Sequence, residues 1–163
     1  MALKTTHTTI RADTDVTAYL SETGRKIVRD GSRLWALGVD YNVGLRACYS
    51  DDWGKTWASE SVQDADGNYV SASASLAIDS NGVLHCAYQL NSATNNRLFY
   101  KKRSGGSWST RTQLHSTTGD VACIHLLVGN DDELHVLWVG YDDDIAEEGV
   151  WHRRWDATGW WGK

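Results

Sequence analysis

Residues 49–57 read YSDDWGKTW, a short Asp/Gly segment with two tryptophans four residues apart. An Asp side chain can accept backbone N–H groups of its own turn, and Gly tolerates the positive φ that tight turns need. The tryptophan that ends the segment supplies a large ring for packing between layers. The segment therefore predicts a hairpin turn with a structural tryptophan.

This segment lies within a unit that occurs three times. Leucines 50 residues apart begin an apolar, strand-like run in each copy: Leu34, Leu84 and Leu134. A tryptophan follows in each copy, at spacings of 51 and 52 residues: Trp57, Trp108 and Trp160. Each copy is expected to hold three strands in meander order and then a fourth. Four-stranded antiparallel repeats of about 40 to 50 residues are typical of propeller blades, so the sequence predicts an all-β propeller with three blades per chain.

Composition limits the class of protein. The chain has 163 residues, of which 41% are hydrophobic and 23% charged, with 15 Gly and no Pro, as expected for one globular domain. Its net charge of −5 disfavours nucleic acid and anionic membranes as partners, because both attract clustered Lys and Arg. Three cysteines without CxxC spacing predict buried free thiols: Cys48, Cys86 and Cys123. Because the N-terminus also lacks a signal-peptide pattern, we expect cytoplasmic synthesis, which suits a phage or bacterial surface component.

Five residues of the opening segment match the pattern SxDxGxTW: Ser50, Asp52, Gly54, Thr56 and Trp57. In this they resemble the Asp-box (BNR) repeats of the sialidase-type propellers. The resemblance implies a structural turn between the third and fourth strands, with its Trp between neighbouring blades, on the face away from the catalytic site. It does not imply sialidase activity. The other two copies, KKRSGGSW and HRRWDATGW, keep the Trp but have lost or moved the Asp.

A second, weaker resemblance concerns RWDATGWW at 154–161, which is similar to the Trp-Asp-Gly-x-Gly-Trp turn of small bacterial fucose-binding lectins. The short repeat chains of those lectins assemble into a six-bladed ring. Three blades are too few for a closed ring, since propellers typically have about four to eight blades. The sequence therefore predicts a homodimer that closes a six-bladed ring, with a fragment of a longer chain as the alternative.

The two ends of the chain predict how the last blade is completed. Residues 6–16 are similar to 110–121, which form the fourth strand and exit loop of the second copy, whereas the third copy stops at WWGK. We therefore predict that residues 5–12 supply the outer strand of the third blade, either in their own chain or in the partner chain of the dimer. The expected divisions of the single domain 1–163 are a closing strand and loop at 1–20 and blades at 21–70, 71–120 and 121–163.

Catalysis is not predicted. The Arg-Ile-Pro motif of sialidases requires a Pro that this chain lacks, and nothing beside Arg25, Arg46 and Arg97 matches the arginine triad of that family. None of the five Glu stands in a setting that suggests a paired acid and nucleophile. No cofactor and no metal are expected. His85 and His135 occupy the same position in successive blades, so a sheet spacing of about 10 Å separates them. Ligands of one metal ion must converge, and these two histidines are therefore not expected to bind a metal together.

Loops between second and third strands carry the candidate ligand residues. These loops, at 40–44, 90–96 and 141–149, should emerge together on the face opposite the Asp-box turns. Aromatic faces beside amide and carboxylate groups suit sugar recognition, although polar loops also occur wherever strands turn. The candidates are Tyr41, Asn42, Asn91, Asn95, Tyr141 and Asp142. A solvated loop is expected for the acidic residues at 142–148, rather than a Ca²⁺ site, because they lack calcium-loop spacing.

These features predict a non-enzymatic binding or structural module that presents its loops to a glycan or a protein. The alternatives are a sialidase-like glycoside hydrolase, or a fragment of one, and a scaffold subunit without a small ligand.

Overall fold

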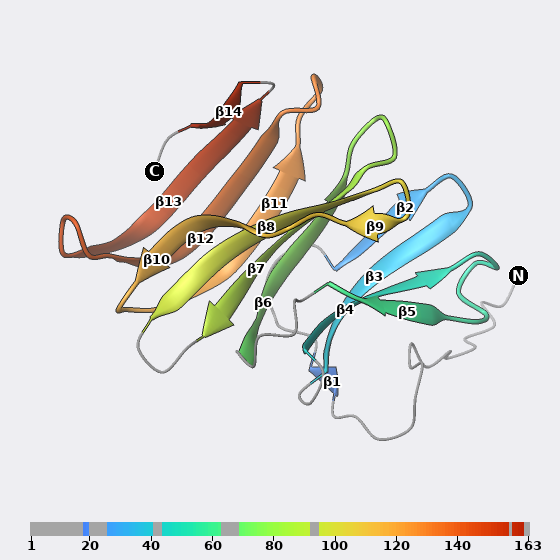
Figure 1. The fold of residues 1–163 in the computed structure, drawn as a ribbon, viewed down its shortest axis with the longest axis horizontal. Helices are drawn as coiled ribbons and strands as arrows, with labels where there is room; N and C mark the ends of the chain where they lie inside the picture. The colour runs from blue at the N-terminus through green and yellow to red at the C-terminus, as the bar shows by residue number, and fades with distance from the viewer. Residues whose placement is uncertain are drawn as a thin grey trace, which may run out of the picture.

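The computed structural model describes residues 18–19, 26–40, 44–62, 69–91, 95–156 and 158–161. These residues form fourteen strands in three antiparallel sheets and no helix (Figure 1). The described part of the chain accordingly has no helix that could cross a membrane. The prediction of an all-β chain is confirmed, with one sheet for each copy of the sequence unit.

The first sheet has one edge made of two short strands. Its strands are β1 (Ala18–Tyr19), β2 (Ile27–Asp30), β3 (Arg33–Asp40), β4 (Gly44–Ser50) and β5 (Ala58–Ser61). β2 pairs with the first half of β3, and β1 pairs with its end, where Ala18 lies opposite Asp40. β1 and β2 thus share the place of a single first strand, which gives this sheet a four-strand order.

The second and third sheets repeat that order. The second contains β6 (Tyr69–Ile78), β7 (Leu84–Asn91), β8 (Asn96–Ser104), β9 (Ser107–Trp108) and β10 (Thr112–Thr117). Its outer place is shared by β9 and β10, since both pair with β8. The third contains, in order, β11 (Val121–Val128), β12 (Leu134–Asp142), β13 (Glu147–Asp156) and β14 (Gly159–Trp161).

Two hydrophobic cores hold the three sheets together, with the second sheet in the middle. The core between the first and second sheets includes Leu45 and Tyr88, which are fully buried. The core between the second and third sheets includes Ala87, Ile124 and Trp138. Successive residues of a strand point to opposite faces, so neighbours on β7 such as Ala87 and Tyr88 enter different cores. This explains why β7 is an almost continuous run of buried residues.

The third sheet contains a fourth strand that the sequence did not predict. β14 pairs with Arg154–Asp156 at the end of β13, in the place that β9 takes on β8. The expectation that the third copy ends before its fourth strand was wrong, because the chain reverses at once through Gly159, whose φ is +130°. No described strand takes the place of β10 along residues 147–153 of β13. Residues 5–12, predicted for that place, lie outside the described residues.

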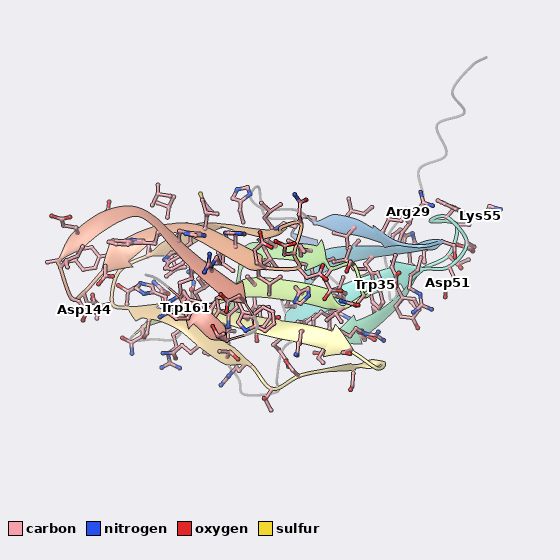
Figure 2. The ribbon with its side chains drawn as sticks, turned by 90° about the horizontal axis from the view of Figure 1, so that it is seen from above. Arg29, Trp35, Asp51, Lys55, Asp144 and Trp161 are labelled. Atoms are coloured by element: carbon pink, nitrogen blue, oxygen red, sulfur yellow. The ribbon has the colours of Figure 1, made fainter. Side chains whose placement is uncertain are left out.

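The meander gives the molecule two ends. The first-to-second and third-to-fourth turns lie at one end, named here the turn end. The facing ends of the second and third strands, with the described loop at 143–146 and the link at 118–120, lie at the other, the loop end. Figure 2 shows Asp51 and Lys55 of the turn end far from Asp144 of the loop end. The described loop at 143–146 therefore lies opposite the turn at 50–57, whereas residues 41–43 and 92–94 of the other two candidate loops lie outside the described residues.

Candidate functional site

The turn at 50–57 joins β4 to β5 at the turn end. The Asp52 carboxylate accepts the backbone N–H groups of Lys55 and Thr56 at 3.0 and 2.8 Å and the Thr56 hydroxyl at 2.7 Å. These hydrogen bonds, chiefly the one from the Thr56 backbone, lower the pKa of Asp52 to about 2. Trp53 and Gly54 follow with φ of 62° and 85°. Because the carboxylate is used within the turn, its geometry suits a structural role.

Trp57 lies against this turn, where its indole N–H donates to the Gly54 carbonyl at 3.1 Å. Its counterparts behave differently. Trp108 packs against the core between the first and second sheets, and Trp160 against the core between the second and third. Within the described residues Trp57 packs against neither core. The packing between blades expected for Trp57 is therefore not seen in the described chain.

A second Asp-centred turn joins β13 to β14. Asp156 Oδ1 accepts the Thr158 backbone N–H at 2.9 Å, the Thr158 hydroxyl at 2.6 Å and the Trp161 indole N–H at 3.1 Å. These bonds, with the Thr158 hydroxyl first, lower the pKa of Asp156 to about 2. The segment that departs from the Asp-box pattern thus keeps an Asp–Thr–Trp hydrogen-bond set in a shorter turn.

At the loop end, Asp143 joins two loops. Its carboxylate accepts the Thr118 N–H at 2.9 Å, the Thr118 hydroxyl at 2.8 Å and the Thr117 hydroxyl at 3.2 Å. The Thr118 hydroxyl is the largest cause of a lowered pKa for Asp143. Asn96, the first residue of β8, donates to the Gly119 carbonyl at 2.8 Å. Three segments of the loop end are therefore ordered against one another by directional hydrogen bonds.

The predicted amide ligands lie on the second sheet. Asn91, at the end of β7, accepts a hydrogen bond from the Gln89 side chain at 2.6 Å. Asn95 is half-buried just before β8. Tyr41 and Asn42 lie outside the described residues. The ligand roles of these four residues remain predictions.

Tyr141 and Asp142 lie on the third sheet. Tyr141 packs so closely on Gly119 that a Cβ there would be 2.4 Å from the Tyr141 Cβ, and only glycine leaves this room. Asp142 is 2% exposed, and its carboxylate accepts the Asp144 N–H at 2.9 Å. Asp142 therefore helps to close its own loop, while Asp143 makes the contact with Thr118. The spacing of acidic residues gave no signal to distinguish these neighbours.

A cluster that the sequence did not predict links the first and second sheets. Glu60 of β5 accepts two hydrogen bonds from Arg103 of β8, at 2.5 and 3.1 Å, and one from the Trp108 indole at 2.7 Å. The Arg103 guanidinium also lies over Trp35, 4.7 Å from the ring centroid. Glu60 and Arg103 are 43 residues apart in the chain. Neither belongs to a motif, so no local signal could have paired them.

Buried rings join the second and third sheets. His85 Nδ1 lies 2.7 Å from the Tyr100 hydroxyl, and its Nε2 lies 3.3 Å from Asp79. Burial lowers the pKa of His85, although Asp79 partly opposes the shift, and burial also raises the pKa of Tyr100. Both rings are therefore held uncharged at neutral pH.

The described carboxyl groups share one electrostatic feature. Every one with a resolved shift has a lowered pKa, with hydrogen bonding as the largest cause: Asp51, Asp52, Asp132, Glu133, Asp143 and Asp156. A glycosidase acid needs the opposite, a raised pKa. Among the described residues, no three His, Cys, Asp or Glu side chains are grouped as a metal site requires.

The three cysteines are free thiols, as predicted. Cys86 is fully buried between the first and second sheets, and this burial raises its pKa to about 12. Cys48 and Cys123 are only half-buried, so the prediction of a buried thiol was wrong for these two.

Comparison with known proteins shows the fold. No protein-family model matches the sequence, and no curated protein matches it. Several solved structures are similar over most of the chain, and three of them are described here. A protein of unknown function from Dyadobacter fermentans has a TM-score of 0.64 at 14% identity, with 87% of this chain and 39% of that chain covered. An ulvan lyase, a polysaccharide lyase, has a TM-score of 0.63 at 13% identity, covering 84% and 42%.

The third similar structure is the Aleuria aurantia lectin in complex with α-methyl-L-fucoside, with a TM-score of 0.51 at 14% identity, covering 85% and 43%. The chain thus spans about two fifths of the length of each of these structures. The three sheets have a propeller-like fold shared with carbohydrate-binding and carbohydrate-processing proteins.

Proposed function

We propose that this chain is a carbohydrate-binding propeller module that acts without catalysis and binds its ligand at the loop end. The observation that carries the proposal is the hydrogen-bonded order of that end, where Asp143 and Asn96 hold three segments together. A pre-ordered polar surface loses little conformational entropy when it binds a sugar. Tyr141 supplies an aromatic ring beside these polar groups.

The fold supports a carbohydrate ligand by analogy. Similar structures include a fucoside-binding lectin, an ulvan lyase and a xylan β-1,4-xylosidase from Bacillus halodurans, whose TM-score is 0.57. Identities of 13 to 16% carry no residue-level role across to this chain. The assignment of the ligand surface therefore rests on the loop-end geometry of this chain.

The carboxyl groups with a shifted pKa support a binding role. Retaining and inverting glycosidases place an acid of raised pKa near a second carboxylate. Here hydrogen bonds to backbone and hydroxyl groups keep the shifted carboxyls ionised, as in Asp52 and Asp143. Those carboxylates serve to order turns and loops.

A matched pair of variants tests the site. Asp143 and Asp132 each accept a backbone N–H and a hydroxyl from the second sheet, Asp143 from Thr118 at the loop end and Asp132 from Ser80 at the turn end. A glycan array followed by calorimetry would identify and quantify the ligand. We expect Asp143→Ala and Tyr141→Ala to weaken binding at least tenfold and Asp132→Ala to leave it unchanged.

The same experiment can reject the proposal. Equal losses in Asp143→Ala and Asp132→Ala would mean that the loop end is not the site. Turnover of fluorogenic glycosides that a single Arg or carboxyl replacement abolishes would establish the hydrolase alternative. A clean array would favour a scaffold subunit.

A further inference from the structure

The outer face of the third sheet leaves large apolar side chains exposed. On this face Val150 is 72% exposed, Leu127 50%, Val139 42% and Leu137 39%. These four residues are named here the third-sheet face. Adjacent strands contribute them, since Val139 of β12 lies directly opposite Val150 of β13. His125, His135 and His152 lie opposite or between them on the same face. Exposed apolar side chains gathered on one sheet face usually mark an interaction surface.

The strand register identifies the same positions in the other two sheets. Val150, Leu98 and Leu45 hold one ladder position, because each lies opposite the fifth residue after its repeat leucine: Val139, Gln89 and Val39. Leu45 and Leu98 are both 0% exposed, because the following sheet covers them. One position is thus covered in the first two sheets and open in the third.

A pair of rings repeats the same pattern. His85 and Tyr100 stack with centroids 6.0 Å apart, and they are 3% and 7% exposed against the third sheet. His135 and His152 hold the corresponding ladder positions and stack at 5.2 Å, with Nδ1 of His135 3.0 Å from Nε2 of His152. The third-sheet face therefore carries the side-chain arrangement that the second sheet uses against its neighbour.

The first sheet has the complementary open face. Ile27 lies opposite Ala36 in the ladder and is 53% exposed. Its counterparts Leu76 and Leu126 are 0% and 4% exposed, because each packs against the preceding sheet. The first sheet therefore has an apolar side chain ready for a preceding sheet.

Trp57 belongs to this open face. Trp108 reaches the preceding sheet through Glu60, at 2.7 Å, and Trp160 reaches it through Tyr100, at 5.1 Å between ring centroids. Trp57 holds the same place after its third strand and has no preceding sheet in the described chain. If a third sheet like that of this chain lay before the first sheet, its His152 would hold the position that Tyr100 holds before Trp160. That His152 would then lie beside Trp57.

We propose that the third-sheet face binds the first sheet of a second copy of this chain. A second copy is the favoured occupant because the complementary face, with Ile27 and Trp57, is on this chain itself. A two-fold axis lets each copy use both faces, so the contact closes without open growth. The resulting pair would have the six sheets of a ring. This inference is independent of the proposed ligand.

The experiment measures mass in solution for the full chain and three variants. Val150→Arg places a charge on the third-sheet face, and Ile27→Arg places one on the first-sheet face. Ile145→Arg is the control, since Ile145 is 54% exposed in the loop between β12 and β13 and lies off both faces. We expect wild type and Ile145→Arg to have twice the 18.1 kDa of one chain, and the other two variants to be monomers.

Mixing gives a second, positive measurement. The Val150→Arg chain keeps an intact first-sheet face, and the Ile27→Arg chain keeps an intact third-sheet face. In a mixture, the intact first-sheet face of one variant can bind the intact third-sheet face of the other. The mixture should therefore show the mass of a dimer, which neither variant forms alone. Circular dichroism confirms that each variant is folded.

A wild-type monomer, an open series of sizes, or a mixture of folded variants that stays monomeric would overturn the proposal. A dimer that survives Ile27→Arg but not Val150→Arg would also overturn it, since the third-sheet face would then pair with itself.

Discussion

The Glu60 cluster gives a direct test of what joins the first and second sheets. Replacing Glu60 by Ala removes the acceptor of two Arg103 hydrogen bonds and of the Trp108 indole N–H. A hydrogen bond to a charged group contributes about 1.5 to 3 kcal/mol. The Arg103 and Glu60 side chains remain 18% and 25% exposed, so water recovers part of the loss. We therefore expect Glu60→Ala to lower the free energy of unfolding by about 2 kcal/mol.

The chain offers a matched control. Asp51 accepts two hydrogen bonds from Arg33, at 2.6 and 2.9 Å, but these side chains are 59% and 35% exposed within one sheet. Asp51→Ala should produce no measurable loss, since exposed ion pairs contribute little. Urea unfolding followed by tryptophan fluorescence measures both variants, and a double-mutant cycle with Arg103→Ala isolates the coupling. Equal effects of Glu60→Ala and Asp51→Ala would refute the assignment of Glu60 as a tie between sheets.

Three further predictions concern titratable groups. Asp52 has a pKa of about 2, so it stabilises the fold fully above its unfolded pKa of about 3.9 and loses this effect as the pH falls toward 2. The difference in urea midpoint between wild type and Asp52→Asn should therefore shrink between about pH 3.9 and 2. A constant difference would contradict the prediction. Burial lowers the pKa of His85, so the unfolded chain takes up the proton first and stability falls as pH drops below about 6.5; His85→Gln should reduce that fall between pH 7.5 and 5. Cys86 has a pKa of about 12 and no exposed surface, so it should react with iodoacetamide only after the chain unfolds. Peptide mass spectrometry measures this reaction. Modification of native Cys86 at the rate of the half-buried Cys123 would show that this core opens.

Much of the fold could be predicted from the sequence because it depends on local patterns. The spacing of Leu34, Leu84 and Leu134 predicts one sheet per copy. In the structure Leu84 and Leu134 begin β7 and β12, and Leu34 is the second residue of β3. The Asp/Gly segment at 50–57 predicts the turn between β4 and β5. A strand alternates its side chains and a turn needs particular backbone angles, so short stretches of sequence carry both signals.

The tertiary structure alone decided which side chains meet between sheets. Glu60 meets Arg103, and Asp143 rather than Asp142 meets Thr118, because stacking and loop closure select among residues of similar type. The early fourth strand β14 likewise depends on the tight reversal at Gly159. Local preferences determine the shape of each strand and turn. Contacts between residues far apart in the chain depend on how whole sheets stack, and no local pattern contains that information.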